Sequence, residues 1–462
     1  MAHARGPNPA LRRCMAEAGW NGPALAAALQ KVARESGLSV GYDRTTVAHW
    51  LSGTQPRPPG PQLLEEAFAR RLGRPVSLVE LGLRPPVRAL SAEESEPTDP
   101  VAGLRQWHSW PESAPPDDDT SASPLFQVRL LPSPRLPAPE PQLPCRTGPF
   151  HRPPVTAPAP AARPTADRPT MDRPSMDRAG AERVGARQVE AVREMTAFAA
   201  RHYDAYGGAI ARGLLLGYLR DQVLPWLRSP AADLRHRELL SAASQLVRLV
   251  GRTYTDDNRH GEAQRHYRLA YRMAAEAQDG QAESMALRDQ STQAGALGHQ
   301  AYASRLADAA AEHLPGAAAP GVRAFVLAQQ AVAAARLRQA GEAMRRLDGA
   351  QQWAGRAASE GGPHRYPEPA LLYQTAQVHQ ALRATESALS YLRASLRARP
   401  QGEHRTIGVS LLQLAHLELD AGNIHQARRA HATFRERHEA LRSPATSLQL
   451  ARLEGRFARL GG

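Results

Sequence analysis

The sequence predicts an all-α fold in which a disordered, proline-rich linker joins a small N-terminal helical bundle to a C-terminal α-solenoid. Apolar residues recur at helical spacing in both end regions, and no alternating strand pattern is found. Of the 39 prolines, 20 fall between residues 89 and 185. Beyond that stretch an alanine-centred pattern recurs along the chain. We therefore expect three parts, residues 1–88, 89–185 and 186–462.

In the first part, helix-capping signals divide residues 1–88 into four helices and a short final turn. Asparagine or aspartate followed by helix-forming residues opens the first three helices, and proline at the first turn supports the first two. Glycine ends each of them, as a residue with a left-handed backbone often does. The fourth helix follows a proline-rich segment, and the last turn covers residues 77–81. The expected caps are Asn8, Asn21 and Asp43, and the expected terminating glycines are Gly19, Gly37 and Gly53.

The third of these helices is the candidate DNA-binding element. Its apolar side would pack on the second helix, which leaves small polar and basic residues on the opposite side. Such a helix suits the major groove of DNA, where base edges present donors and acceptors. Arginine would bond a guanine edge or a phosphate, threonine a thymine methyl or a phosphate, and the chain after the helix would bind phosphates. The candidate contacts are Arg44, Thr45, Thr46, His49, Thr54 and Arg57. The alternative is a solvated face on a module that binds only protein.

Charge supports a polyanionic partner for this region. Residues 1–88 hold 12 lysines and arginines against 6 aspartates and glutamates, a net charge of +6. A domain this basic is a candidate for nucleic-acid binding, and an arginine-rich surface without such a role is the alternative.

Proline density predicts that residues 89–185 are mostly disordered. Each proline removes a backbone donor and fixes φ, so that a stretch this rich in proline is not expected to form helices or central strands. Two apolar islands interrupt the linker, at residues 107–110 and 125–131. They are either short docking segments or unstructured parts of the linker.

The third part, residues 186–462, is predicted to be a helical repeat array. Two long helices come first, over 186–206 and from Gly208 to about Leu224, where Pro225 should stop the second. A small–large–small pattern then recurs, with starts 40, 40 and 45 residues apart and a weaker fifth copy near Ala427. Because this period exceeds the 34 residues of a tetratricopeptide (TPR) repeat, the array is TPR-like. The copies begin at Ala263, Ala303, Ala343 and Ala388.

Arrays of this kind stack helix pairs into a superhelix whose concave face commonly holds a peptide or a protein segment. Core packing is the favoured interpretation for the aromatic residues among the candidates for that face. These candidates are Tyr267, Tyr271, Arg305, Gln329, Gln330, Tyr373 and Gln377.

Residues of the third helix carry a resemblance to a known family. Val47, Trp50 and Gly53, followed by Pro56, resemble the recognition-helix segment of Xre/Cro-type helix-turn-helix regulators. The wider segment 42–76 is similar to the N-terminus of actinobacterial, Streptomyces-type regulators that join this domain to a TPR-like region, the NsdA-like group. The resemblance implies DNA binding and the repression of development or secondary metabolism. Residues 36–42, between the second and third helices, exceed the turn of a standard helix-turn-helix.

Chemical motifs are few, and we expect no enzymatic activity, cofactor or metal. Phosphate-binding glycine loops and a His-Glu-x-x-His motif are absent from the sequence, and the 17 histidines do not cluster at metal-ligand spacing. The two cysteines, Cys14 and Cys145, are too few for a disulfide framework. Without an apolar run of about 20 residues or a secretory signal, a cytoplasmic protein is expected.

The leading hypothesis is a transcriptional regulator that binds double-stranded DNA and whose TPR-like region senses a protein or peptide partner or forms a homodimer. The alternative is a protein-interaction scaffold whose helix-turn-helix-like head does not bind DNA. A third hypothesis is a peptide-pheromone receptor of the same architecture.

Overall fold

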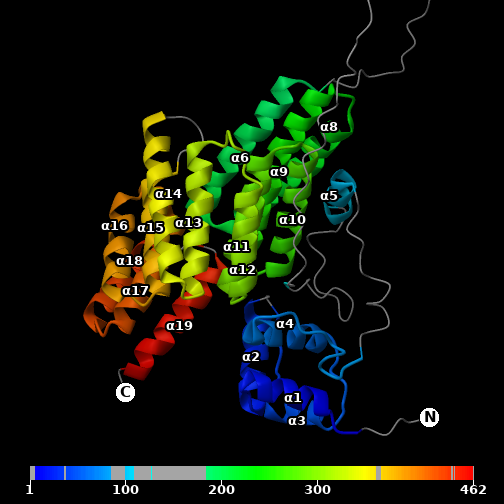
Figure 1. Ribbon diagram of the computed structural model, residues 1–462, viewed down its shortest axis with the longest axis vertical. Coiled ribbons are helices and arrows are strands. Elements are labelled where there is room, and N and C mark those ends of the chain that lie inside the picture. Colours follow the sequence, from blue (N-terminus) through cyan, green and yellow to red (C-terminus); the bar gives the residue numbers. More distant parts are fainter. Residues whose placement is uncertain are drawn as a thin grey trace, which may run out of the picture. The chain divides into compact units, whose positions relative to one another are not determined.

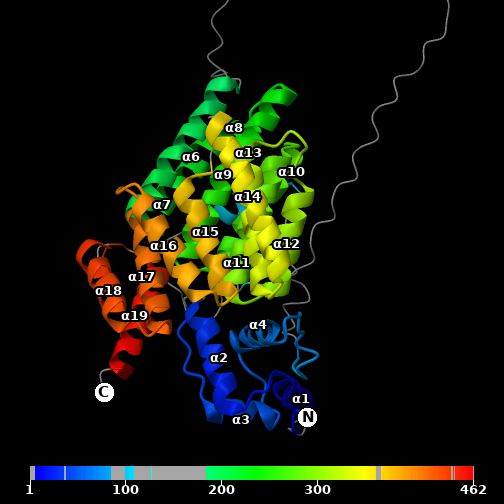
Figure 2. The ribbon, with the colours of Figure 1, turned by 60° about the vertical axis from the view of Figure 1, so that its left-hand side comes forward.

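The computed structural model describes residues 6–35, 38–84, 99–108, 126, 184–360, 366–438, 441 and 443–460. Every regular element in these ranges is a helix, which confirms the all-α prediction (Figures 1 and 2). The chain divides into two units, residues 1–132 with 183–462, and residues 133–182. The second unit lies outside the described residues, as does most of the segment predicted to be disordered. None of the described helices is both long enough and apolar enough to cross a membrane.

Four helices and a final turn form the N-terminal domain, as the capping signals predict. The helices are α1 (Pro9–Ala18), α2 (Gly22–Glu35), α3 (Arg44–Leu51) and α4 (Gly60–Leu72). Asn8 caps α1 by accepting the Leu11 N–H, and its side chain also donates to the carbonyl of Leu81 in the final turn, both at 2.9 Å. Gly19 ends α1 with a φ of 66°. The position predicted for Gly37 lies outside the described residues.

The core of this domain collects the apolar stripes that the sequence shows. Leu25, Leu29 and Val32 of α2 pack with Val47 and Trp50 of α3, and all five side chains are buried. Aromatic contacts connect the layers, since Trp20 lies 5.1 Å from Phe68 and Tyr42 lies 5.2 Å from Trp50, measured between ring centroids. Gly53, with a φ of 99°, ends the turn after α3 where a Cβ atom would clash with the Gly6 carbonyl. A larger residue at position 53 would therefore strain the backbone and displace the N-terminal segment.

A helix forms inside the proline-rich segment, so the prediction that 89–185 lacks helices is wrong at that place. Helix α5 covers Pro100–His108. Pro100 occupies its first position, where the missing N–H costs nothing, and Asp99 accepts the Val101 N–H at 2.8 Å. No further proline follows until Pro111, which leaves room for two helical turns.

Two residues of the proline-rich segment, one in α5 and one in the second apolar island, pack on the repeat domain. Leu104 of α5 is fully buried in the core formed by the first helices of that domain. Phe126 is also buried, its ring stacked on His299 at 5.1 Å and close to Tyr302. The docking interpretation is therefore supported at Phe126 of the second island, whereas the side chains of the first island lie outside the described residues.

The repeat domain begins with a helical layer whose second helix does not stop at Pro225, contrary to the prediction. Helix α6 covers Ala186–Tyr206, α7 covers Gly208–Tyr218, a π-helical turn η1 covers Leu219–Val223, and α8 covers Leu224–Arg228. In η1 the Leu224 N–H bonds the Leu219 carbonyl, five residues back. This wider turn places Pro225 at the start of α8, where no donor is needed, and the chain continues as helix.

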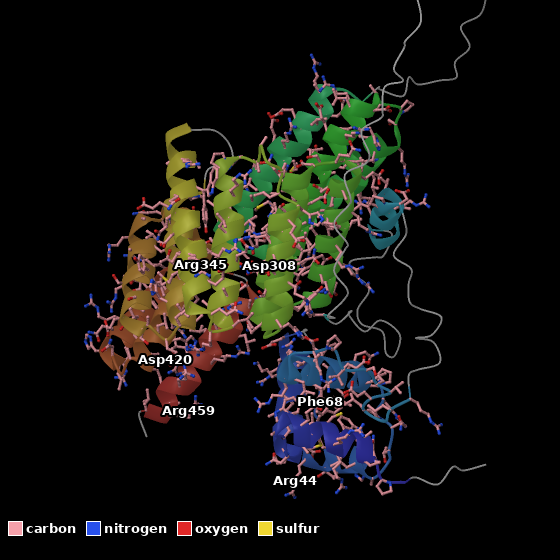
Figure 3. All side chains as sticks on the ribbon, viewed as in Figure 1. Arg44, Phe68, Asp308, Arg345, Asp420 and Arg459 are labelled. Atoms are coloured by element: carbon pink, nitrogen blue, oxygen red, sulfur yellow. The ribbon has the colours of Figure 1, made fainter. Side chains whose placement is uncertain are left out.

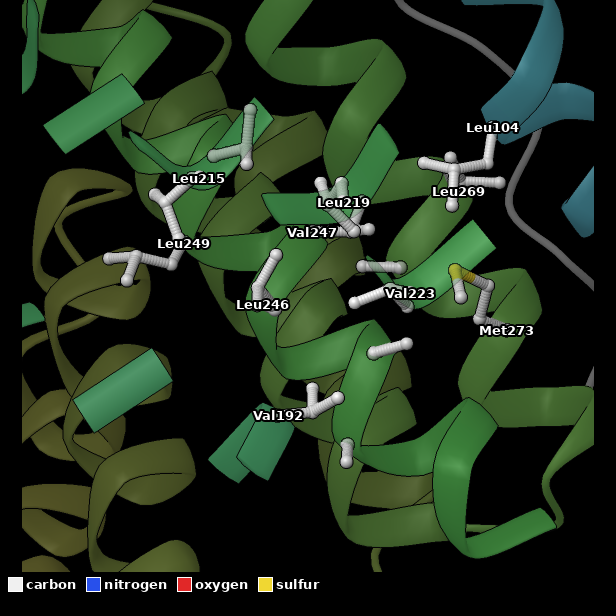
Figure 4. Close-up of a cluster of buried hydrophobic side chains, with 14 of the residues drawn as sticks. Leu104, Val192, Leu215, Leu219, Val223, Leu246, Val247, Leu249, Leu269 and Met273 are labelled. Atoms are coloured by element: carbon white, nitrogen blue, oxygen red, sulfur yellow. The ribbon is translucent and has the colours of Figure 1, made fainter. Parts of the chain in front are cut away.

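Buried side chains of this layer and of the next two helices, α9 (Asp233–Asp256) and α10 (His260–Glu276), make one core (Figure 4). Figure 4 shows Leu215 and Leu219 packed near Leu246 and Val247 of α9, with Leu269 and Met273 of α10 closing the cluster. Burial of these side chains supplies the main stabilising free energy of the domain.

Five antiparallel helix pairs follow along the chain, which confirms the repeat prediction (Figures 1 and 2). The second helix of each pair carries the small–large–small pattern, and its small and large residues are buried in the first four copies, as is Ala427 in the fifth. Small residues let the two helices of a pair approach closely. After the pair α9–α10, the remaining helices are α11 (Gly280–Leu297), α12 (Gln300–Glu312), α13 (Pro320–Arg336), α14 (Ala340–Glu360), α15 (Glu368–Ala381), α16 (Thr385–Ala398), α17 (His404–Asp420), α18 (Ile424–His438) and a final α19 (Pro444–Leu460).

The turn inside each pair contains one residue with a left-handed backbone. Glycine, which adopts this conformation most readily, occupies it in the second and fifth turns, as Gly298 and Gly422. Asn258, Arg338 and Arg383 adopt the same conformation in the other three, with φ between 60° and 66°. The first four of these residues lie 40, 40 and 45 residues apart, which is the spacing of the sequence repeat.

Candidate nucleic-acid interface

Helix α3 presents one stripe of exposed polar and small residues. Arg44, Thr45, Ala48 and His49 are all exposed, while Val47 and Trp50 are buried on the opposite side. Residues three and four apart lie next to each other on a helix, so these four side chains form a continuous surface. Figure 3 shows Arg44 at the outer edge of α3 and Phe68 among the packed helices of the domain.

Thr46, another candidate contact, is occupied within the domain. Its N–H and its hydroxyl both donate to the Asp43 carboxylate at 2.8 Å, and its hydroxyl also accepts the Asp43 N–H, which makes a capping box. These hydrogen bonds hold the pKa of Asp43 below its usual range. The structure therefore gives Thr46 the role of starting α3, and Thr45 is the threonine free to face a ligand.

Arg44 lies beside the first turn of α2. A Cβ atom added at Gly22 would lie 3.5 Å from the Arg44 Cγ, which shows that the arginine stem passes over that glycine. The first backbone N–H groups of a helix attract anions. The arrangement thus carries the Arg44 side-chain stem across the start of α2, next to the exposed stripe of α3.

Thr54 and Arg57 lie beyond the C-terminal end of α3, away from Arg44 by the length of an eight-residue helix, about 12 Å. Arg57 is exposed and Thr54 is half-buried. Five of the six candidates therefore form two groups. Arg44, Thr45 and His49 lie on the stripe of α3, and Thr54 and Arg57 lie beyond its C-terminal end. The sixth candidate, Thr46, belongs to the N-terminal cap of α3.

The connection between α2 and α3 differs from the tight turn of a standard helix-turn-helix. Residues 38–43 alternate between half-buried and exposed, as an extended segment does. Gln30 of α2 donates to the Tyr42 carbonyl at 2.6 Å, so this segment runs back along α2. The long connection noted in the sequence thus packs on the domain.

All six carboxylates of the domain are engaged within it. Glu35 and Glu66 contact Arg70, Glu17 and Glu80 contact Arg74, Glu65 accepts the Leu78 N–H, and Asp43 caps α3. Other basic side chains are exposed and form no ion pair with a described residue. The excess positive charge of the domain is therefore at its surface. These residues are Arg12, Arg13, Lys31, Arg34, Arg44, Arg57, Arg71 and Arg84.

Comparison with known families gives one match. The SP15 N-terminal domain family matches residues 11–84, from within α1 to the turn after α4. The N-terminal domain of this chain is thus similar to that domain, and the match covers less than a fifth of the chain. No curated protein matches the chain significantly.

Most residues predicted for the concave face of the repeat domain belong to its packing. Tyr267, Gln329 and Gln330 are buried, and Gln329 donates to the Ser291 hydroxyl at 2.9 Å. Arg305 is exposed and lies over the Tyr302 ring. The core interpretation is therefore correct for Tyr267.

A cluster of arginines within the repeat domain was not singled out from the sequence. Asp289 of α11 pairs with Arg248 of α9 and with its neighbour Arg288, at 2.7 and 2.8 Å. Arg252 lies over the Tyr203 ring. Although burial raises the pKa of Asp289, the charges of Arg248, Arg288 and Arg252 together hold it below its usual range. Arginines outnumber aspartates in this cluster, which leaves it with a net positive charge. With 57 arginines spread along the chain, no sequence pattern distinguishes these three.

The described ranges contain no group of three or more histidines, cysteines or acidic residues that could hold a metal ion.

Proposed function

We propose that this chain is a cytoplasmic transcriptional regulator that binds double-stranded DNA through α3 and responds to a protein or peptide partner through its repeat domain. The observation that carries the proposal is the α3 stripe of Arg44, Thr45, Ala48 and His49, exposed on a domain whose carboxylates are all engaged. The resemblance of Val47, Trp50, Gly53 and Pro56 to Xre/Cro-type recognition segments supports the same function. From the NsdA-like resemblance, the output would be repression of development or secondary metabolism.

In this proposal some residues contact base edges and others contact phosphates. Arg44 and Thr45 would contact base edges from the N-terminal turn of α3, and His49 would lie one turn further along the groove. Thr54 and Arg57, beyond the end of α3, would bind phosphates and set the orientation of the domain. A substitution of Arg44 would then relax sequence preference, whereas Arg57→Ala would weaken binding to all sequences by a similar factor.

The repeat domain supplies the partner-binding half of the proposal. Its arginine cluster around Asp289 favours a partner that carries carboxylates. Partner binding would change the distribution of the chain between states with different DNA affinity.

Selection of genomic fragments from the source organism with purified full-length protein tests this function. We expect the wild type to enrich a defined sequence and the Arg44→Ala/Thr45→Ala variant to lose that enrichment. The Lys31→Ala/Arg34→Ala variant is the matched control, because it also removes positive charge but leaves α3 unchanged. Loss of enrichment in the control as well would contradict a role specific to α3. Absence of DNA binding at low salt would favour the alternative, a protein-interaction scaffold.

A further inference from the structure

The first two helices of the repeat domain leave an apolar face exposed. Among the described residues, nine large hydrophobic side chains are exposed, and four of them lie within 17 residues on α6 and α7. They are Phe198, Tyr206, Ile210 and Leu214. The other five are scattered over separate elements. Exposed apolar side chains that gather in one place are typical of an interaction surface.

Aromatic rings form a ladder along α6. The Phe198 ring lies 4.3 Å from the His202 ring, which lies 5.5 Å from the Tyr206 ring, measured between centroids. Successive rings are four residues apart and so lie on one side of the helix. Side chains that already contact one another have less conformational freedom to lose on binding, which lowers the entropic cost of association.

Helix α7 lies antiparallel to α6 and widens this surface. A single residue, Gly207, separates the two helices. Burial, together with the negative charge of Glu194 in the first half of α6, raises the pKa of Tyr218 at the end of α7, so these two residues lie near each other. In that register Leu214 lies beside the ladder. Small exposed residues, Ala209 and Gly213, alternate with Ile210 and Leu214, and no atom lies within 4 Å of a Cβ placed at Gly213. The face thus offers both large side chains and the space to receive them.

Two opposite charges flank Phe198 on α6. Glu194 and Arg201 are seven residues apart, which places them two turns apart on the same side of the helix. Both are exposed, and neither forms an ion pair with a described residue. A helix that packs antiparallel against a second copy of itself, with Phe198 near the two-fold axis, brings Glu194 of each copy to Arg201 of the other. The charge pattern is therefore self-complementary.

We propose that this face binds a second copy of the chain, with α6 packed antiparallel on the partner's α6. Phe198 of each copy then packs against Ala197 of the other, and two reciprocal Glu194–Arg201 pairs close the ends of the contact. The interface is isologous, as in most homodimers. It goes beyond the proposed function, because dimerisation is measured without DNA and does not depend on α3.

Sedimentation of the full-length protein over a range of concentrations tests the proposal. We expect the wild type to dimerise, and we expect Glu194→Arg and Arg201→Glu each to weaken the dimer about tenfold or more, because each places like charges together twice. The double variant Glu194→Arg/Arg201→Glu should recover the wild-type affinity. An equimolar mixture of the two single variants should form a heterodimer, since both of its pairs are then of opposite charge.

Arg193→Glu is the matched control, because residue 193 points about 140° away from Phe198 around the helix and should leave dimerisation unchanged. Circular dichroism of every variant separates loss of dimer from loss of fold. A wild type that stays monomeric at all concentrations, or single variants that dimerise as the wild type does, would overturn the proposal. A monomer in which Phe198→Asp increases cleavage of residues 109–183 by protease would assign the face to another segment of this chain, and would overturn it too.

Discussion

Replacing Asp256 with alanine is expected to destabilise the repeat domain by about 3–5 kcal/mol, the cost of removing one partner from a buried ion pair. Asp256 is buried at the end of α9 and bonds groups from three other segments. Its carboxylate accepts hydrogen bonds from the Gly208 N–H at 3.0 Å, from the Arg405 guanidinium at 2.7 Å and from the Ser443 hydroxyl at 2.9 Å. Gly208 begins α7, Arg405 lies in α17, and Ser443 precedes α19.

The reason for so large an effect is that Asp256 joins the first helices of the array to the last. Helices α17 and α19 pack on α6 and α9, and Arg405 also lies over the Tyr203 ring of α6, at 4.4 Å from its centroid. Without the carboxylate, the half-buried guanidinium and the buried N–H of Gly208 lose their acceptor.

Urea unfolding of the wild type and two variants measures this effect. Asp420→Ala is the matched control, because Asp420 pairs with Arg456 on the surface, and we expect it to cost less than about 1 kcal/mol. A loss below that value for Asp256→Ala would show that the contact between the first and last helices contributes little to stability.

Replacing Gly251 with alanine is the second large effect, an expected loss of about 1–3 kcal/mol from overpacking. Gly251 lies in α9 where the Tyr267 ring of α10 crosses it. An added Cβ would lie 2.6 and 2.7 Å from two ring carbons. Tyr267 has little freedom to move, since its ring is buried and its hydroxyl bonds the Thr255 hydroxyl at 3.1 Å.

Gly355→Ala is the control for the intrinsic effect of glycine in a helix. Gly355 is exposed in α14, and nothing lies within 4 Å of an added Cβ, so alanine should stabilise by about 0.5–1 kcal/mol. Thermal unfolding of the two variants should thus give shifts of opposite sign. A shift in the same direction for both would mean that the Tyr267 contact does not limit the size of residue 251.

Local signals in the sequence predict most of the fold. Asn8, Asn21 and Asp43 mark the starts of the first three helices because capping depends on a few adjacent residues, and the copies of the repeat pattern mark the buried faces of α10, α12, α14 and α16. The proline content averaged over residues 89–185 does not predict the helix at Pro100–His108, because it does not show that ten consecutive residues in this segment contain no proline. The helix continues past Pro225 because of the π-helical turn η1, and no local sequence pattern predicts that turn.

The candidate DNA-binding residues are only partly predictable in the same way. Residue type identifies Arg44, Thr45 and His49 as groups that suit DNA, and helical spacing places them on one side. The engagement of Thr46 with Asp43 follows from a capping box, which the sequence also contains. The pairing of Glu17 and Glu80 with Arg74 depends on contacts 57 and 6 residues apart along the chain, so the exposed charge of the domain emerges only from the structure.

The most direct test of the account is the ratio of the affinities of the full-length protein for an enriched DNA sequence and for its scrambled version, measured by fluorescence anisotropy at rising salt. Specific recognition through α3 predicts a ratio of about 10³ or more for the wild type, with affinity for both DNAs falling steeply with salt. It predicts a ratio at least about tenfold lower for Arg44→Ala/Thr45→Ala. A wild-type ratio near one would contradict the account, because the N-terminal domain would then be only a basic surface that attracts any DNA.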